Sequence, residues 1–311
     1  MKKYLSVIAF CMAMICIVSL CGCAGTATGD DEQASAVQTY SERLQSCKEQ
    51  IAAITDFQPQ IVLVLGTGLG DFANTLDIKE TIPYADIEGW PIATAPEHAG
   101  NLIFAEYQGL KLAVMQGRIH YYEGYTMEEV VLPLRVLHLL GADTAILSNA
   151  VGSLNLDFKV GEFVCVKDQI SSFIPSPLIG ENDEELGERF VEMTNAFDQE
   201  MQDTLLKIGQ ENDIPVHSGV YLEVPGPQFE TPAEIEMYRS LGADTIAMSL
   251  CDEVIAARQM GMKVCGINVV SNMAAGMDEG FSQDTIEASM KETTEDFQVL
   301  IDALLDSLAA K

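Results

Sequence analysis

Basic side chains are scarce in this 311-residue chain. Its 17 lysines and arginines stand against 47 aspartates and glutamates, which gives a formal net charge of −30 at pH 7. Nucleic acids and anionic lipid surfaces attract proteins of the opposite charge. The composition therefore argues against nucleic acid as a partner and against a membrane surface that is bound through charge.

Cysteines with the spacing of a metal site are also missing. Four of the eight cysteines lie within the first 23 residues, and the other four are Cys47, Cys165, Cys251 and Cys265. These four are far apart in sequence and match no metal-ligand motif. Cys165 and Cys265 lie in apolar, strand-like runs, which favours buried free thiols over a disulfide framework.

The glycine-rich stretch Gly66–Gly70 lacks residues that two common nucleotide-binding loops require. No Lys-Ser/Thr pair follows it, as a P-loop needs, and the third glycine of a dinucleotide-binding loop is missing. The preceding residues Ile61–Leu65 are all branched aliphatics, which predicts a strand buried on both faces. The loop can offer backbone N–H groups and the Thr67 hydroxyl to an anion such as phosphate. A tight connection without a ligand is the alternative.

The N-terminus has the features of a targeting segment. Lys2 and Lys3 precede an apolar stretch that ends in Leu20-Cys21-Gly22-Cys23. This pattern resembles a bacterial lipoprotein signal peptide over residues 1–22, with Cys23 as the lipidated residue. An uncleaved membrane anchor is the alternative, because the apolar stretch is just long enough to span hydrocarbon. Both interpretations place the rest of the chain outside the cytoplasmic membrane.

The segment after the signal is expected to be a tether. Residues 23–40 are small, polar and acidic, with too little apolar content to fold. We expect a folded domain at 41–311, exported and held on the outer face of the cytoplasmic membrane by the lipid anchor alone.

Apolar periodicity in residues 41–311 alternates between strand and helix patterns. Leu102–Tyr107 and Lys111–Gln116 flank a short glycine-containing turn and predict a hairpin. Further strands are expected at 144–148, 163–167, 216–224, 245–248 and 264–270, and helices at 40–54, 127–140, 197–210, 232–241, 252–260 and 284–308. This alternation favours an α/β fold with its functional loops at strand ends.

Arg118 and His120 follow the second strand of the hairpin. Because they are two residues apart at a strand end, both side chains lie on one face, where they suit an oxyanion. The small residues 149–153, after the strand at 144–148, are expected to form a second loop with backbone donors. The alternative is a surface arginine and a structural histidine beside an aromatic cluster.

Taken together, these stretches resemble the trimeric class of purine nucleoside phosphorylases from about residue 45 to the C-terminus. The shared motifs are G-T-G-L-G at 66–70, P-E-H-A-G at 96–100, Q-G-R-I-H-Y-Y-E-G-Y at 116–125, S-N-A-V-G-S-L-N at 148–155, N-D-E-E-L-G-E-R-F at 182–190, G-P-Q-F-E-T at 226–231, A-M-S at 247–249 and V-S-N at 270–272. The resemblance implies a single domain with a central mixed, twisted β-sheet flanked by helices, the nucleoside phosphorylase fold, and a homotrimer.

The resemblance also implies reversible phosphorolysis of purine (deoxy)ribonucleosides to free base and (deoxy)ribose 1-phosphate. Inorganic phosphate is the co-substrate, and no metal or organic cofactor is required. Phosphate is expected at Thr67, His98, Arg118, His120, Ser249 and the backbone of Ala150. The nucleoside is expected against Tyr122, Phe229, Glu230, Met248 and Asn272, with Phe190 lent by a neighbouring subunit.

The resemblance assigns catalytic roles to Asn272, Glu230 and His120. Asn272 can donate to the purine ring as negative charge develops there, and Glu230 can accept from N–H groups of the base. Asparagine at 272 points to 6-oxopurines such as inosine and guanosine. Gln283 stands where the family usually has a histidine against the sugar 5′-hydroxyl, so that contact differs.

Two alternatives to this function stay open at the level of sequence. One is a non-catalytic surface lipoprotein that captures nucleosides, which the export signal and Gln283 suggest. A pure receptor has no use for a phosphate pocket, however. The other is a phosphorylase tuned to xanthosine or another purine nucleoside, which the base-contacting residues also allow.

Overall fold

A nine-stranded mixed sheet organises the part of the chain that the structure describes, residues 38–277 and 283–310 of a computed structural model. The predicted signal peptide, Cys23 and all but the end of the predicted tether lie outside these residues. The strands are β1 (Ile61–Leu65), β2 (Asp77–Pro83), β3 (Asn101–Tyr107), β4 (Leu110–Gln116), β5 (Thr144–Ser153), β6 (Phe163–Ile170), β7 (Val216–Glu223), β8 (Thr245–Ala247) and β9 (Lys263–Met273).

Part of the sheet is open, and the rest closes into a barrel. Its strand order is β2-β3-β4-β1-β5-β8-β7-β6-β9, and β9 pairs again with β5. Strands β5, β8, β7, β6 and β9 therefore form a closed ring. Since β4, β1, β5 and β9 run parallel to one another, their carboxyl ends meet at one edge of the sheet.

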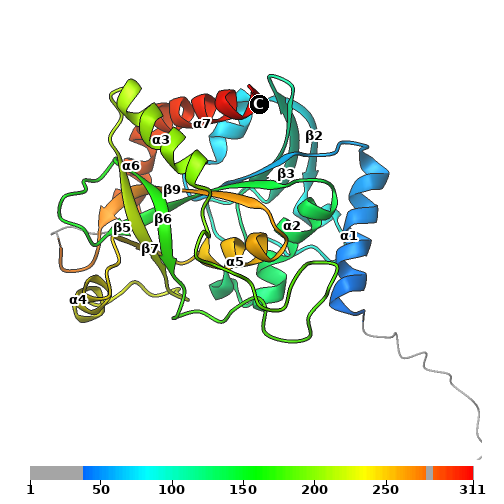
Figure 1. Ribbon diagram of the computed structural model, residues 1–311, viewed down its shortest axis with the longest axis horizontal. Helices are drawn as coiled ribbons and strands as arrows, with labels where there is room; N and C mark the ends of the chain where they lie inside the picture. The colour runs from blue at the N-terminus through cyan, green and yellow to red at the C-terminus, as the bar shows by residue number, and fades with distance from the viewer. Residues whose placement is uncertain (1–37, 278–282, 311) are drawn as a thin grey trace, which may run out of the picture. The chain divides into compact units, whose positions relative to one another are not determined.

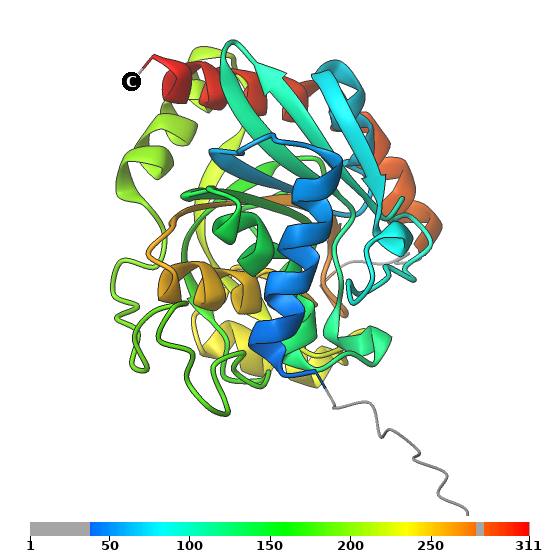
Figure 2. The same ribbon diagram turned by 90° about the vertical axis from the view of Figure 1, so that its right-hand side faces the viewer.

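Helices cover both faces of the sheet, as the sequence predicted. In Figure 1, α3 and α7 lie above the sheet and α2 and α5 below it, while α1 lies beside α2 in both views (Figure 2). The helices are α1 (Tyr40–Ile54), α2 (Met127–Leu139), α3 (Gln199–Glu211), α4 (Pro232–Ser240), α5 (Cys251–Gln259), α6 (Gln283–Glu292) and α7 (Thr294–Ala309).

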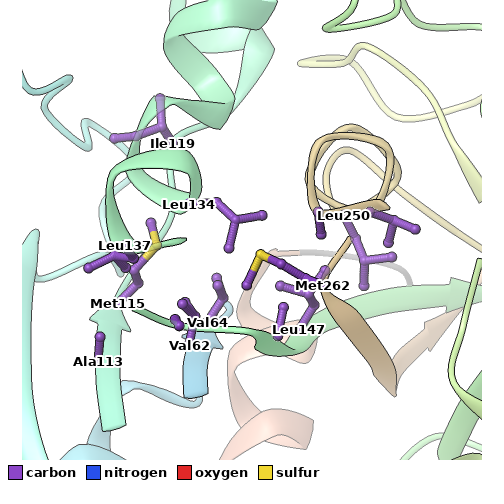
Figure 3. Close-up of a cluster of buried hydrophobic side chains, with 14 of the residues drawn as sticks. Val62, Val64, Ala113, Met115, Ile119, Leu134, Leu137, Leu147, Leu250 and Met262 are labelled. Carbon is purple, nitrogen blue, oxygen red and sulfur yellow. The ribbon is translucent and has the colours of Figure 1, made fainter. Parts of the chain in front are cut away.

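Strand β1 is buried on both faces, which confirms the prediction from its uninterrupted aliphatic run. Val62 and Val64 point to the side of α2 and α5, where they meet Leu134 and Met262 (Figure 3). Ile61, Leu63 and Leu65 point to the other side and join the core beneath α3 and α7. The strand is thereby held in one register, because a shift by one residue would exchange the two cores.

Threonine caps set the start of three helices. Thr39, Thr126 and Thr231 each accept a hydrogen bond from the backbone of a glutamate three residues later, whose carboxylate bonds back to the threonine backbone. This capping box satisfies backbone donors that a helix start leaves free. Local sequence therefore suffices to begin α1, α2 and α4.

The structure corrects the sequence prediction in three places. Residues 149–153 are not a loop, because β5 continues through them and pairs with β9. Strand β2 was not predicted; it pairs with β3 through its backbone while most of its side chains are exposed. The single helix expected at 284–308 is two helices, and the hydroxyls of Thr293 and Thr294 bond to the Met290 carbonyl where the first ends.

The four cysteines in the described residues are free and buried, as predicted. Within the same residues, no cluster of three or more histidine, cysteine, aspartate or glutamate side chains could hold a metal ion. None of the helices that the structure describes has both the length and the apolar character needed to cross a membrane.

Candidate active site

A cavity of about 430 Å³ lies where several strands end. It brings together most of the residues that the sequence singled out. Of these, the lining includes Thr67, Arg118, His120, Tyr122, Ala150, Phe229, Glu230, Met248, Ser249 and Asn272.

Arg118 is the buried cation of this cavity. Its side chain is 1% exposed, and one Nη donates to the Ser148 carbonyl at 2.6 Å. The other Nη forms an ion pair with the Glu253 carboxylate at 2.9 Å. A guanidinium carries five N–H donors, so donors remain for an anion in the cavity.

Two histidines stack beside Arg118. The ring centroids of His98 and His120 are 5.0 Å apart, and Tyr122 stacks on the other face of His120 at 4.6 Å. Nδ1 of His98 lies within 3.0 Å of the Arg118 backbone, and its Nε2 lies 3.5 Å from the Thr67 hydroxyl. Burial lowers the pKa of His98 to about 4 and also lowers that of His120. Both rings are therefore neutral at pH 7.

Glu123 orients His120. Its carboxylate contacts His120 Nδ1 at 3.0 Å and accepts from the His120 backbone N–H at 2.8 Å. Burial opposes its ionisation, but hydrogen bonds from His120 and Thr94 lower the pKa of Glu123 to about 2. A carboxylate at Nδ1 favours the tautomer with a proton there, which leaves Nε2 as an acceptor.

Ser249 lies on a strained connection between β8 and α5. The next residue, Leu250, has a φ of +93° although it is not glycine, and its side chain is fully buried. The Tyr221 hydroxyl donates to the Ser249 carbonyl and holds the connection from β7. Backbone strain of this kind costs about 1–3 kcal/mol and is typical of functional sites.

The loop after β1 and the middle of β5 pack against each other beside Arg118. A side chain on Gly66 would lie 2.7 Å from the Ser148 carbonyl, so only glycine allows this approach. Asn149, 2% exposed, accepts from the Asn268 amide, and its own Nδ2 has no hydrogen-bond partner among the described residues. Ala150 follows it in the cavity lining.

Asn272 and Glu230 give the cavity an amide and a carboxyl group. The Ser271 hydroxyl donates to Asn272 Oδ1 at 2.8 Å, and Asn272 Nδ2 donates to the Met273 carbonyl at 3.0 Å. These two bonds fix which way the amide faces. Burial raises the pKa of Glu230. Phe229, at the same loop, is about half exposed.

Two predicted residues that the structure describes do not line this cavity, and a third cannot be placed. His98 lies behind it, in contact with Thr67 and Arg118. Phe190 is 87% exposed and lines a separate hollow. Gln283 is the first residue of α6, and its side chain lies outside the part of the chain that is described.

The sequence did not single out four residues that line the cavity or contact the predicted residues. Glu123, Asn149 and Ser271 lie within the family motifs at 116–125, 148–155 and 270–272. Those motifs were the only indication in the sequence that these residues belong to the site. Glu253 lies 135 residues from Arg118 and belongs to no such motif. No local pattern could have paired these two residues.

Comparison with known proteins assigns the family. The family model described as "Phosphorylase superfamily" matches residues 60–306. Purine nucleoside phosphorylase 1 of Geobacillus stearothermophilus is 40% identical over 252 residues, which cover 81% of this chain and 92% of the relative. Purine nucleoside phosphorylase of Bos taurus is 38% identical over 243 residues, 75% of this chain and 82% of its own.

A solved structure shares the fold as well. The crystal structure of a Schistosoma purine nucleoside phosphorylase in complex with hypoxanthine has a TM-score of 0.81 and 36% identity, and the match covers 86% of this chain and 97% of that one. The predicted α/β fold with a mixed central sheet is thereby confirmed. This chain belongs to the purine nucleoside phosphorylases, a family of enzymes within the phosphorylase superfamily.

Proposed function

We propose that this protein catalyses reversible phosphorolysis of purine nucleosides. A phosphate oxygen bonds to the anomeric carbon of the sugar, and the glycosidic bond breaks with its electron pair going to the purine. The supporting observation is a single cavity that holds the donors Thr67, Arg118 and Ser249 together with Glu230 and Asn272. Membership of the family supports the same reaction.

Each group has a task in this reaction. As the bond breaks, positive charge develops on the sugar and negative charge on the purine. The bound phosphate anion stabilises the sugar, with its own charge held by Arg118 and by neutral donors around it. Asn272 donates to the ring nitrogen that gains negative charge, and Glu230 accepts from the N–H groups of the base. Phosphate is a co-substrate, and the mechanism needs no other cofactor.

The proposed substrates are 6-oxopurine nucleosides, inosine and guanosine. The Ser271 hydroxyl occupies one lone pair of Asn272 Oδ1 and so supports an amide that presents N–H to the base. Xanthosine or another purine nucleoside is the alternative substrate. Competition between inosine, guanosine, xanthosine and adenosine, measured as kcat/KM, decides among them.

We also propose that the active enzyme is a homotrimer in which Phe190 completes a neighbour's site. Phe190 is 87% exposed, and Ile179 in the same hollow is 69% exposed, which is unusual for large apolar side chains unless they meet a partner. Light scattering of the wild type gives the oligomeric state. F190A should raise KM for the nucleoside more than KM for phosphate.

The proposed location is the outer face of the cytoplasmic membrane, through lipid on Cys23. The supporting feature is the Leu20-Cys21-Gly22-Cys23 pattern after an apolar stretch. Metabolic labelling with a radioactive fatty acid should mark the wild type and not C23S. Labelling of both proteins, or of neither, contradicts this location.

The experiment that tests the function is release of hypoxanthine from inosine, with and without inorganic phosphate. Phosphate-dependent release with formation of ribose 1-phosphate is expected. Binding of inosine or guanosine by folded protein without release of base would instead identify the nucleoside-capturing lipoprotein.

A further inference from the structure

Three buried carboxyl groups form a cluster at the start of α5, and one of them pairs with the Arg118 side chain. Glu223 at the end of β7 and Asp252 and Glu253 in the first turn of α5 are each at most 4% exposed. Glu253 forms the ion pair with Arg118, and Glu223 accepts from the Cys251 backbone N–H at 2.6 Å. Asp252 accepts from the Glu253 backbone at 2.7 Å.

This cluster has more carboxyl groups than its one cation can neutralise. Glu253 alone balances Arg118, so an ionised Asp252 or Glu223 adds uncompensated negative charge in a buried place. Such a charge is costly, and the group takes up a proton instead. An anion that binds to Arg118 meets the same charge and is repelled by it.

We propose that Glu253 positions the Arg118 guanidinium for phosphate and that phosphate binds only weakly once Asp252 behind it loses its proton. The proposal rests on the proposed function, because it concerns the phosphate part of the same cavity. It makes phosphate binding and proton uptake by the enzyme a coupled event. The coupling is reciprocal, since bound phosphate makes Asp252 harder to deprotonate.

The titration behaviour of the cluster agrees with this geometry. Burial, together with the neighbouring Glu253, raises the pKa of Asp252 to about 7. Burial, together with Asp252, raises the pKa of Glu223 well above its ordinary value. Asp252 is the member whose pKa lies near neutrality, and the raised pKa of Glu223 favours its protonated form as well.

The other titratable groups that face the cluster stay uncharged near pH 7. Burial raises the pKa of the Tyr84 and Tyr221 hydroxyls and of the Cys251 thiol. Burial lowers the pKa of His98 and His120, which would attract an anion only at lower pH. The part of the change in anion affinity between about pH 6 and pH 8.5 that disappears when Asp252 is replaced by asparagine therefore belongs to Asp252.

The first experiment measures sulfate binding by calorimetry as a function of pH. Sulfate resembles phosphate but does not titrate in this range, so the protein alone causes any change. The wild type should bind sulfate about sevenfold more weakly at pH 8.5 than at pH 6, which is the change expected if bound sulfate raises the Asp252 pKa by about one unit from about 7. D252N should bind with the affinity of the low-pH form at both values.

The matched control is D302N. Asp302 on α7 also has a raised pKa, from burial, but it contacts Gln298 and lies outside the cavity. This variant should keep the full pH dependence. If D252N keeps it too, or if the wild type shows none, the proposal is wrong.

A second experiment tests Glu253 as a positioning residue. E253Q should raise KM for phosphate about tenfold or more and KM for inosine much less, because a misdirected guanidinium affects the anion first. E253D, which keeps the carboxylate, should recover part of the loss. Equal increases in both KM values would show a general structural defect and overturn the positioning role.

The two proposals fail in different ways. If no purine nucleoside is phosphorolysed at any pH, the proposed function is wrong, regardless of how sulfate binding depends on pH. If phosphorolysis occurs but sulfate binding does not depend on Asp252, only this inference is wrong.

Discussion

At the scale of single residues, the site depends on groups that hold others in one orientation. Ser271 orients the Asn272 amide, and Glu123 orients the His120 ring. Each contact removes rotational freedom before substrate arrives, which is how a site gains pre-organisation. The consequences of removing either contact can be measured separately.

Replacing Asn272 by aspartate should reduce activity on inosine. A carboxylate cannot donate to the purine ring as negative charge arrives, and it repels that charge. A hydrogen bond to a charged group contributes about 1.5–3 kcal/mol, so kcat/KM for inosine should fall about 10- to 150-fold. Activity on adenosine should fall less. An equal loss on both nucleosides would contradict the assignment of Asn272 to base recognition.

Replacing Glu123 by glutamine should destabilise the fold in a pH-dependent manner. Because the pKa of Glu123 in the folded protein is lowered to about 2, its carboxylate stabilises the fold above the ordinary pKa near 4.5. This contribution disappears as the pH falls through the folded pKa. The difference in unfolding free energy between wild type and E123Q should be about 1–3 kcal/mol at pH 7 and shrink below about pH 4.5.

Urea titrations at several pH values measure that difference. The control is E236Q, a change at an exposed position on α4. It should leave the unfolding free energy unchanged at every pH. A constant difference for E123Q down to about pH 2 would contradict the role given to its charge.

At the scale of secondary-structure elements, α6 packs against the loop that follows β1. Gly68 has a φ of +75°, and a side chain there would lie 2.7 Å from the side chain of Met290. Met290 belongs to α6 and is fully buried. Thr67, beside it, lines the cavity. The position of α6 therefore depends on glycine at residue 68.

G68A should destabilise the protein more than G109A does. Gly109, in the β3–β4 turn, has a φ of +88° but nothing within 4 Å of an added side chain. G109A therefore measures the cost of the left-handed backbone alone, about 1–2 kcal/mol. G68A adds a steric clash with Met290, which should lower the unfolding free energy by about a further 1–3 kcal/mol. If G68A and G109A lower the unfolding temperature equally, α6 must be able to move away from residue 68 at no cost in stability.

At the scale of the whole molecule, the surplus of acidic groups opposes the proposed anionic co-substrate. A net charge of −30 repels phosphate at long range, and salt screens that repulsion within about 8 Å at physiological ionic strength. KM for phosphate should therefore fall as potassium glutamate is raised to about 150 mM. KM for uncharged inosine is the internal control and should not change. An unchanged or rising KM for phosphate would contradict this effect.

Local patterns were sufficient for much of the fold. The aliphatic run 61–65 and the hairpin around Gly109 follow from side-chain period and turn chemistry. The capping threonines begin three helices by contacts within four residues. Strand β2 and the continuation of β5 through 149–153 could not be read in this way. These segments are strands because their backbones pair with β3 and β9, and such pairing produces no alternating apolar pattern in the sequence.

The sequence by itself determined which residues could bind an anion and a base. Arg118 and His120 are neighbours on one strand end, and the motifs around Glu230 and Asn272 are short and local. Only the tertiary structure decided that these groups share one cavity and that Glu253, 135 residues away, pairs with Arg118. The physical reason is that the barrel and the helix α5 bring β4, β7 and α5 together through packing. The cost of burying their charges then decides which carboxyl groups keep a proton.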